Sequence, residues 1–302
     1  MAPTDYLFHK SVLVDEVLEQ LNLQPEGVYI DATFGSGGHT KAILQKEPTC
    51  HVIGMDWDKI SLDTYAPLVA EEFGDRFTPV WGNFATLYKT ARKLRIDQVN
   101  GVLADFGTSQ MQIKERAGFS FNINSPLDMR MSISHYKETA ADIVNHGSFE
   151  KLVYIFSTYG EERFASKIAR AIIAARSTHK FKTTRDLAGL IEKIMPRNKT
   201  NIHPATKVFQ GLRIHINHEL EHIKSFLAGA TSLLADEGRI ACISFHSLED
   251  RIVKQFFRDK AQEGVLEIIT PKAIEASEDE LARNPSSRSA KLRVAAKVAQ
   301  KK

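Results

Sequence analysis

The stretch GVYIDATFGSGGHTK, residues 27–41, decides the fold class. It consists of an apolar run that ends at Asp31, followed at once by a turn that contains three glycines. Glycine adopts positive φ without steric cost, and it lets backbone N–H groups approach a ligand at the N-terminus of the next helix. A strand, a glycine-rich turn and a helix in this order are typical of nucleotide-binding folds. The sequence therefore predicts a nucleotide-like ligand at this turn.

Further apolar runs repeat this arrangement. The first third of the chain contains HVIGMDWD (51–58), FTPVWGNF (77–84) and GVLADFG (101–107), with helical patterns near 40–46, 59–73 and 85–95 between the runs. Strands that alternate with helices of this length form a parallel sheet with helices on both faces. Two later runs, RIACISFHS (239–247) and VLEIIT (265–270), predict that the sheet resumes near the C-terminus.

The middle of the chain has a different pattern. No convincing strand occurs from about Gln112 to Asn201, but helical patterns occur at 139–146, 148–159, 161–177 and 184–195, and a longer one follows at 205–234. We therefore expect an α/β protein with a Rossmann-like sheet that is interrupted by an inserted all-helical domain. The expected boundaries are 1–111 and 202–302 for the sheet domain and 112–201 for the insertion.

The composition indicates a soluble globular protein. The 302 residues are 43% hydrophobic and 25% charged, with a formal net charge of +3. Cys50 and Cys242 lie in apolar, strand-like contexts without a Cys/His quartet, so we expect buried thiols and no metal site. The N-terminus lacks a targeting pattern, and no apolar run approaches the roughly 18 residues of a membrane span. We expect a cytoplasmic protein with no membrane partner.

The glycine spacing and the nearby carboxylates favour S-adenosylmethionine (SAM) over a dinucleotide. Dinucleotide sites use Gly-x-Gly-x-x-Gly, whereas the glycines of FGSGGH are spaced by two and one. Asp56 ends the second predicted strand, where an acidic residue binds the ribose of either cofactor. Asp31 and Asp105, after the first and fourth strands, would repel a pyrophosphate but suit the sulfonium and ammonium groups of SAM. Phe84 is placed to cover an adenine ring.

Seven blocks, in order along nearly the whole chain, resemble the MraW/RsmH family of bacterial ribosomal RNA small subunit methyltransferases. These blocks are HKSVLVDEVLEQL (9–21), YIDATFGSGGHT (29–40), ERAGFSFNINSPLDMRM (115–131), YGEERFASKIARAI (159–172), HPATKVFQGLRIHINHEL (203–220), ISFHSLEDRIVKQFF (243–257) and NPSSRSAKLRVAAK (284–297).

The resemblance implies a SAM-dependent methyltransferase that methylates the exocyclic N4 amine of a cytidine in the decoding region of 16S rRNA. Its expected partner is 16S rRNA or the small ribosomal subunit, and the inserted domain is expected to recognise the substrate. Carried over by position, the family's cofactor contacts fall on Gly37, Gly38, His39, Asp56, Phe84, Asp105 and Gln112.

One loop departs from the family pattern. Family members typically read Asp-Leu-Gly-Val-Ser-Ser-Pro-Gln-Leu-Asp where this chain reads DFGTSQMQIK, residues 105–114. Ser109 keeps its place, whereas Gln110, Met111 and Lys114 replace a serine, a proline and an aspartate. The loop is expected to line the place where the target base meets the methyl group. The contacts to the base are therefore the feature of the family that these replacements affect most.

The expected chemistry is an in-line displacement on a methyl group, which requires nitrogen, carbon and sulfur to be held in a row. An acceptor for the amine hydrogens would localise the nitrogen lone pair, and the candidates are Asp105 and a nearby backbone carbonyl. The alternative for Asp105 is a purely cofactor-binding carboxylate. The target base has to leave its stack to enter such a pocket. His246, Ser247 and Arg251, at the end of the fifth strand, are candidates to contact it, the alternative being a strand-end cap and surface charge.

Two stretches carry only positive charge. Seven Lys or Arg residues and no acidic residue lie in each of 163–185 and 281–302. In the first stretch Arg163, Lys167 and Arg170 share one helix face, apart from an apolar stripe. Such a face predicts contacts to RNA phosphates, which set affinity without reading sequence. The alternatives are a solvated helix face and, for the second stretch, a frayed tail.

Other classes of protein are less well supported. A DNA amino-methyltransferase usually has an Asp/Asn-Pro-Pro-Tyr/Phe loop, which is absent at DFGT. A non-catalytic RNA-binding or ribosome-assembly factor that retains a SAM pocket is the alternative that the altered loop allows. A dehydrogenase is least favoured because its glycine spacing is missing. The oligomeric state stays open, with a homodimer among the options.

Overall fold

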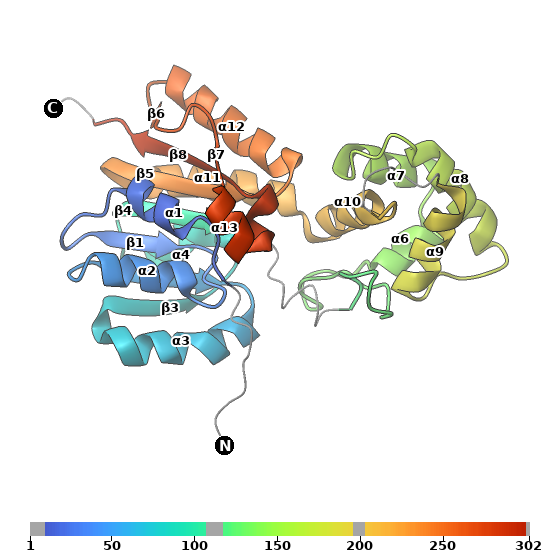
Figure 1. Ribbon diagram of the computed structural model, residues 1–302, viewed down its shortest axis with the longest axis horizontal. Coiled ribbons are helices and arrows are strands. Elements are labelled where there is room, and N and C mark those ends of the chain that lie inside the picture. Colours follow the sequence, from blue (N-terminus) through green and yellow to red (C-terminus); the bar gives the residue numbers. More distant parts are fainter. Residues whose placement is uncertain (1–9, 107–116, 196–202, 300–302) are drawn as a thin grey trace. The chain divides into compact units, whose positions relative to one another are not determined.

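The computed structural model describes residues 10–106, 117–195 and 203–299 (Figure 1). The chain forms two compact units. The first unit joins Met1–Gly107 to Leu220–Lys302, and the second consists of Thr108–Glu219. The second unit is therefore an insertion into the first.

An eight-stranded sheet forms the centre of the first unit, with the strand order β3-β2-β1-β4-β5-β8-β6 and with β7 paired to β8. The strands from β3 to β5 run parallel, whereas β8 is antiparallel to β5, β6 and β7. The strands are β1 (Val28–Asp31), β2 (His51–Asp56), β3 (Phe77–Trp81), β4 (Val99–Asp105), β5 (Leu234–Ser244), β6 (Leu266–Ile268), β7 (Ile274–Glu275) and β8 (Lys291–Lys297).

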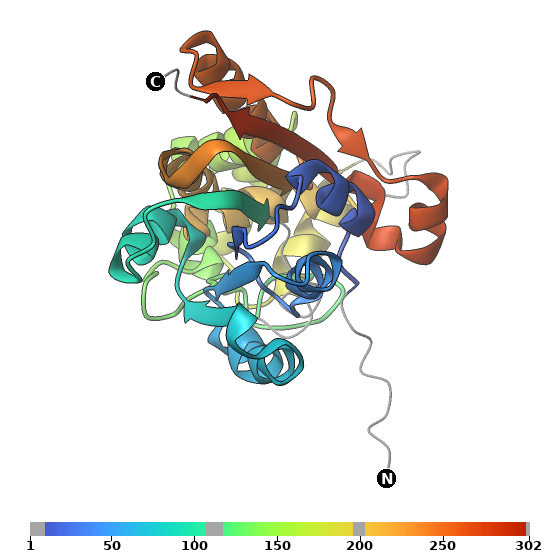
Figure 2. The ribbon, with the colours of Figure 1, turned by 90° about the vertical axis from the view of Figure 1, so that its left-hand side faces the viewer.

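Helices cover both faces of this sheet (Figures 1 and 2). The helices are α1 (Val14–Leu21), α2 (Gly38–Lys46), α3 (Lys59–Phe73), α4 (Leu87–Lys93), α11 (Glu219–Leu233), α12 (Ser247–Gln262) and α13 (Glu278–Arg283). Short 3-10 helices lie at Gly74–Arg76, Phe84–Thr86 and Pro285–Ser289. Residues of α1, α2 and α3 pack with Tyr29, Val52 and Leu103 in one buried cluster. The expected Rossmann-like sheet is confirmed.

The strand β8 was not predicted from the sequence, although it lies between β5 and β6. A buried charge explains why the sequence did not predict this strand. Arg293 is only 9% exposed, and its guanidinium donates to both carboxylate oxygens of Asp250, at 2.6 and 3.2 Å. Lys291 lies 3.4 Å from the Glu275 carboxylate. Residues 291–297 of the basic stretch 281–302 therefore form an interior strand and are not a frayed tail.

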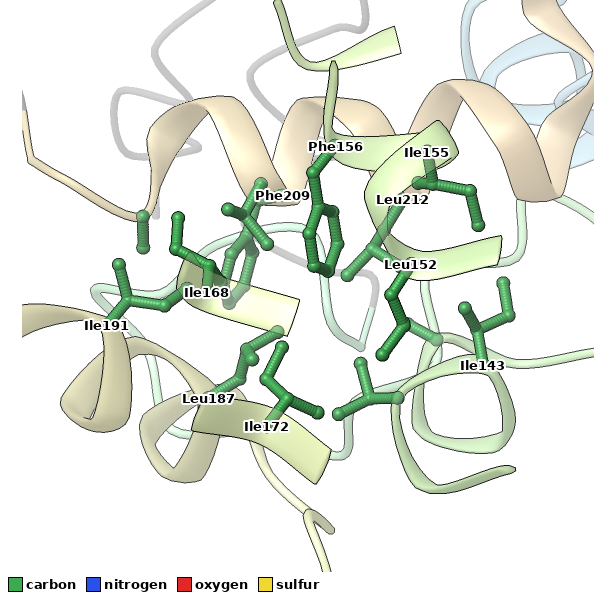
Figure 3. Close-up of a cluster of buried hydrophobic side chains, with 14 of the residues drawn as sticks. Ile143, Leu152, Ile155, Phe156, Ile168, Ile172, Leu187, Ile191, Phe209 and Leu212 are labelled. Atoms are coloured by element: carbon green, nitrogen blue, oxygen red, sulfur yellow. The ribbon is translucent and has the colours of Figure 1, made fainter. Parts of the chain in front are cut away.

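The second unit is helical, and its described residues contain no strand beyond one isolated bridge between Pro126 and Thr183. Its helices are α6 (Ala140–His146), α7 (Phe149–Tyr154), a π-helix (Ile155–Tyr159), α8 (Ala165–Arg176), α9 (Thr184–Ile194) and α10 (Thr206–Asn217). Figure 3 shows the core that these helices enclose, with Phe156, Ile168 and Leu187 among the buried side chains.

Threonine caps mark where two of these helices begin. The side chains of Thr139 and Thr183 accept hydrogen bonds from the N–H groups of Asp142 and Asp186, and those aspartates accept from the threonine N–H groups in return. Such capping boxes satisfy donors that the first helical turn leaves without partners. The local sequence therefore fixes the starts of α6 and α9.

The second unit extends further than the expected 112–201. Helix α10 contributes Val208, Phe209 and Leu212 to the same core, so its apolar face belongs to this unit. The single helix expected over 205–234 is two helices, because His218 adopts a left-handed conformation with φ of 51° between α10 and α11. A non-glycine residue with that φ is uncommon, so the sequence carries no sign of this break.

Cys50 and Cys242 are buried free thiols, as expected. Burial raises the pKa of Cys50 to about 11 and raises the pKa of Cys242 further. Within the described parts of the chain, no helix has the length and apolar character that crossing a membrane requires.

Candidate functional site

The glycine turn joins β1 to α2. Gly35 and Gly37 have φ of 55° and 80°, which is the left-handed region that favours glycine. A Cβ on Gly37 would lie 2.9 Å from the Phe34 ring, and one on Gly38 would lie 2.2 Å from Oγ of Ser11. A side chain at either position would therefore clash, so the two glycines allow Phe34 and Ser11 to pack against the backbone at the start of α2.

Asp56 holds this turn in place from the end of the neighbouring strand. Its Oδ2 accepts the N–H of Gly35 at 2.7 Å, and its Oδ1 accepts the N–H of Asp58 at 2.7 Å. The carboxylate predicted to bind a ribose therefore also fixes the conformation of the turn. These two roles are compatible because each carboxylate oxygen has a second lone pair.

Asp31 differs from the expectation that it faces the ligand. It is only 1% exposed, and its two oxygens accept hydrogen bonds from the Thr40 hydroxyl at 2.7 Å and the Thr33 N–H at 3.2 Å. Burial raises its pKa to about 6, although these hydrogen bonds act in the opposite direction. Asp31 therefore links the end of β1 to the first turn of α2.

Asp105 and His39 lie next to one another at the ends of β4 and the glycine turn. Nε2 of His39 lies 4.0 Å from Oδ2 of Asp105, and the two side chains are 5% and 14% exposed. The backbone N–H of Asp105 donates to Oγ1 of Thr33 at 2.7 Å. His39 was predicted only as a cofactor contact, whereas the structure places its imidazole beside the candidate catalytic carboxylate.

Aromatic rings gather around Phe84, at the carboxyl edge of the sheet. The Phe84 ring lies 5.8 Å from Phe106, 5.9 Å from Phe226 and 6.1 Å from His222. The His222 ring also lies 5.8 Å from Trp57. His222 and Trp57 were missed from the sequence. Trp57 carried a signal, because it directly follows Asp56, but His222 lies far along the chain in α11.

The residues at the end of β5 have structural roles. His246 caps α12: its Nδ1 accepts the N–H of Glu249, and its Nε2 lies 3.0 Å from the Glu249 carboxylate. That buried carboxylate also accepts the N–H of Phe245 at 2.8 Å. Ser247 and Arg251 are exposed in the first turns of α12. Contact with a substrate stays a prediction for His246, Ser247 and Arg251.

Lys167 and Arg170 of the expected basic face lie on α8 in the second unit, whereas Arg163 precedes the first residue of this helix, Ala165. Arg163, Lys167 and Arg170 are exposed, while Ile168 and Ile172 are fully buried in the core. Arg163 and Arg170 lie over the rings of Phe164 and Phe149, at 4.7 and 5.6 Å from their centroids, and Nζ of Lys167 donates to the carbonyl of Ile194. Arg176 lies apart, because its guanidinium donates to the carbonyls of Val144 and Gly147. Two further candidates, Ser109 and Gln112, fall outside the described residues.

Comparison with known proteins identifies the family. Residues 6–298 match the model of the MraW methylase family. The chain belongs to the MraW methylase family. The ribosomal RNA small subunit methyltransferase H of Sulfurihydrogenibium sp. (strain YO3AOP1) is 46% identical over 292 residues, covering 96% of this chain and 99% of that relative. The protein of the same name from Carboxydothermus hydrogenoformans is 43% identical over 307 residues, covering 96% and 98%.

Membership of the MraW methylase family makes this chain a methyltransferase with a Rossmann-like sheet. Its glycine turn, Asp56 and Asp105 lie at the carboxyl ends of β1, β2 and β4 in the first unit. Ligands of open α/β sheets bind at this edge. The candidate site of this MraW methylase is therefore built on rigid strand ends.

The raised pKa of Asp31 predicts a pH-dependent gain in stability for Asp31→Asn. A raised pKa favours the protonated native state, so this stabilisation is complete below the ordinary pKa of 3.8 and is lost as the pH rises through about 6. Asparagine cannot ionise. Relative to the native chain, the variant should therefore gain about 2 kcal/mol between pH 4 and pH 7, because part of the effect of about two pKa units is already present at pH 4.

Urea unfolding of both proteins at these two pH values measures the difference. Asp15→Asn, at an exposed position of α1, controls for the general loss of a carboxylate. A difference between Asp31→Asn and the native chain that stays constant with pH would contradict the prediction.

Thr33 is expected to set the position of Asp105. Thr33→Val keeps the shape of the side chain but removes the acceptor for the Asp105 N–H. A hydrogen bond of this kind contributes about 0.5–1.5 kcal/mol, so methylation should slow by about two- to tenfold. Thr33→Ser keeps the hydroxyl and should keep most of the rate. Initial rates of methyl transfer at saturating substrate test this, with melting temperatures as a check on folding. Equal rates for the two variants would show that the hydroxyl has no such role.

Proposed function

We propose that this chain is a SAM-dependent methyltransferase that methylates the exocyclic N4 amine of a cytidine in the decoding region of 16S rRNA. The match to the MraW methylase family over residues 6–298 carries the proposal. The names of relatives that are 46% and 43% identical, both small subunit rRNA methyltransferases, support the choice of ribosomal RNA as substrate.

The residues at the glycine turn fit SAM. Gly37 and Gly38 lie at the N-terminus of α2, a position that favours a carboxylate such as that of the methionine moiety. Asp56 would hold the ribose hydroxyls, and Phe84 with its neighbouring rings would hold the adenine. Gln112 is proposed as a further contact to SAM, because its position matches a cofactor contact of the family pattern. When bound, SAM supplies an electrophilic methyl group on a sulfonium.

Asp105 is proposed to act on the target amine. A cytosine amine is a poor nucleophile because its lone pair is delocalised into the ring. If the Asp105 carboxylate accepts a hydrogen bond from the amine, that lone pair becomes more localised. When the amine accepts the methyl group, the Asp105 carboxylate would accept the proton that the amine releases. His39, 4.0 Å away, would stabilise the carboxylate while it awaits the proton.

The second unit is proposed to bind the RNA. Its exposed Arg163, Lys167 and Arg170 form a cationic face, and phosphate contacts from such a face give affinity and fall with added salt. Ser109, His246, Ser247 and Arg251 are proposed to contact the flipped nucleotide. A base must leave its stack to reach a pocket of this kind.

Loss of the protein should remove one modified nucleoside from the small subunit. 16S rRNA from cells with and without the gene for this chain is digested to nucleosides and analysed by mass spectrometry. N4-methylated cytidine should be depleted without the protein and restored by the native chain. Unchanged N4-methylated cytidine would contradict the proposed function. It would leave a non-catalytic assembly factor, the alternative that the altered loop DFGTSQMQIK allows.

Asp105→Asn separates the catalytic role from a binding role. The amide keeps the size of the side chain but cannot accept a proton, so methylation should fall by about a hundredfold or more, as expected for loss of a general base. SAM affinity, measured by calorimetry, should stay close to that of the native chain. The exposed Asp97→Asn is a matched control in the same unit. Loss of SAM binding in Asp105→Asn would assign Asp105 to the cofactor instead.

A further inference from the structure

A π-helix interrupts the second unit at a defined place. Helix α7 continues into the π-helical segment Ile155–Tyr159, which ends at Gly160. Such turns are rare and are frequently found at functional sites, because the extra residue redirects the side chains around it. The mechanism proposed above does not use this segment.

Helix α10 holds the π-helix by direct backbone packing. A Cβ on Gly160 would lie 2.4 Å from the carbonyl oxygen of Lys207, and one on Gly211 would lie 2.8 Å from that of Ile155. The amide of Gln210 donates to the carbonyl of Tyr159 at 3.2 Å. On its inner side, the segment buries Ile155 and Phe156 in the core (Figure 3). The π-helix is therefore a rigid part of this unit.

Three rings contact one another on and beside this segment, with Tyr154 at 81° to Tyr159 and Tyr159 tilted by 34° to His215. We call Tyr154, Tyr159 and His215 the ring row. The Tyr154 and Tyr159 centroids are 5.5 Å apart, and those of Tyr159 and His215 are 5.8 Å apart. Tyr154 is 52% exposed, and the other two rings are half-buried. The half-buried rings fix the row, while the tyrosine at its end presents an aromatic surface to solvent.

Positive charge accompanies the ring row. Lys207 is exposed, and its Nζ donates to the carbonyl of Glu161 at 3.0 Å, which places an ammonium group directly beyond the π-helix. Arg163 is exposed three residues after Gly160, in the turn that precedes α8. Of the acidic residues in this turn, Glu162 is buried and accepts the N–H of Phe164. Exposed aromatic surface beside cations matches the faces of bases and their phosphates.

We propose that the ring row is a stacking platform for the bases of a single-stranded segment of RNA. The identity of this RNA as the methylation substrate rests on the proposed function, but the platform itself does not. Base–aromatic stacking is tolerant of sequence, and its loss weakens binding by roughly 5- to 150-fold per base. Double-stranded RNA keeps its bases within the helix and does not offer them to the platform.

The test compares variants of Tyr154 in the full-length protein. Tyr154→Ala and Tyr154→Leu remove the aromatic ring, and Tyr154→Phe retains it. Tyr88→Ala is a matched control, because Tyr88 is 47% exposed and lies in the other unit. Binding of a short fluorescein-labelled single-stranded RNA and of the corresponding duplex is measured by fluorescence anisotropy. Methylation of small subunits from cells that lack the protein is measured in parallel.

Tyr154→Ala and Tyr154→Leu should weaken binding of the single strand by at least about fivefold, while Tyr154→Phe and Tyr88→Ala keep the native affinity. Binding of the duplex should not change. Native affinity in Tyr154→Ala, equal weakening in Tyr88→Ala, or no binding of the single strand by the native chain would each overturn the platform. Ring-dependent binding by a native chain that methylates no subunit would support the platform and count against the proposed function.

Discussion

The candidate site depends on hydrogen bonds that tie the glycine turn to neighbouring strand ends. Asp56 accepts the N–H of Gly35, Asp31 accepts from Thr33 and Thr40, and Thr33 accepts the N–H of Asp105. These hydrogen bonds hold the ends of three parallel strands and the start of α2 in fixed positions relative to one another. Fixed positions favour methyl transfer, because this reaction depends mainly on the alignment of atoms and less on the movement of a proton.

Much of the first unit was predictable because its parallel strands are buried on both faces and therefore read as continuous apolar runs. The runs that became β1, β2, β4 and the second half of β5 follow this rule, whereas β3, at the edge of the sheet, is only partly buried. The strand β8 does not, because Arg293 interrupts it and is neutralised by Asp250, a partner that only the folded chain brings near. The break at His218, where the backbone is left-handed, falls close to the boundary between the two units.

The site residues also include some that the sequence predicts and some that it does not. The positions of Gly37, Gly38, Asp56 and Asp105 follow from the rule that ligands bind at the carboxyl ends of parallel strands. The inward direction of Asp31 and the proximity of His39 to Asp105 do not follow, because they depend on side-chain orientation across elements. The ring row was equally hidden, since it joins α7, the π-helix and α10, and the two glycines that allow this approach are 51 residues apart in sequence.

The position of β8 has a consequence for how the chain folds during synthesis. Residues 291–297 fill an interior place in the sheet, and β5 and β6 have no direct pairing without them. Until residues 291–297 have been synthesised, β5 keeps an open edge that can pair wrongly. The helical unit, complete by about residue 219, can form its own core earlier. The first unit is therefore completed only after the helical unit, so deletion of residues 291–297 should be far more damaging than a change of equal length at a surface loop.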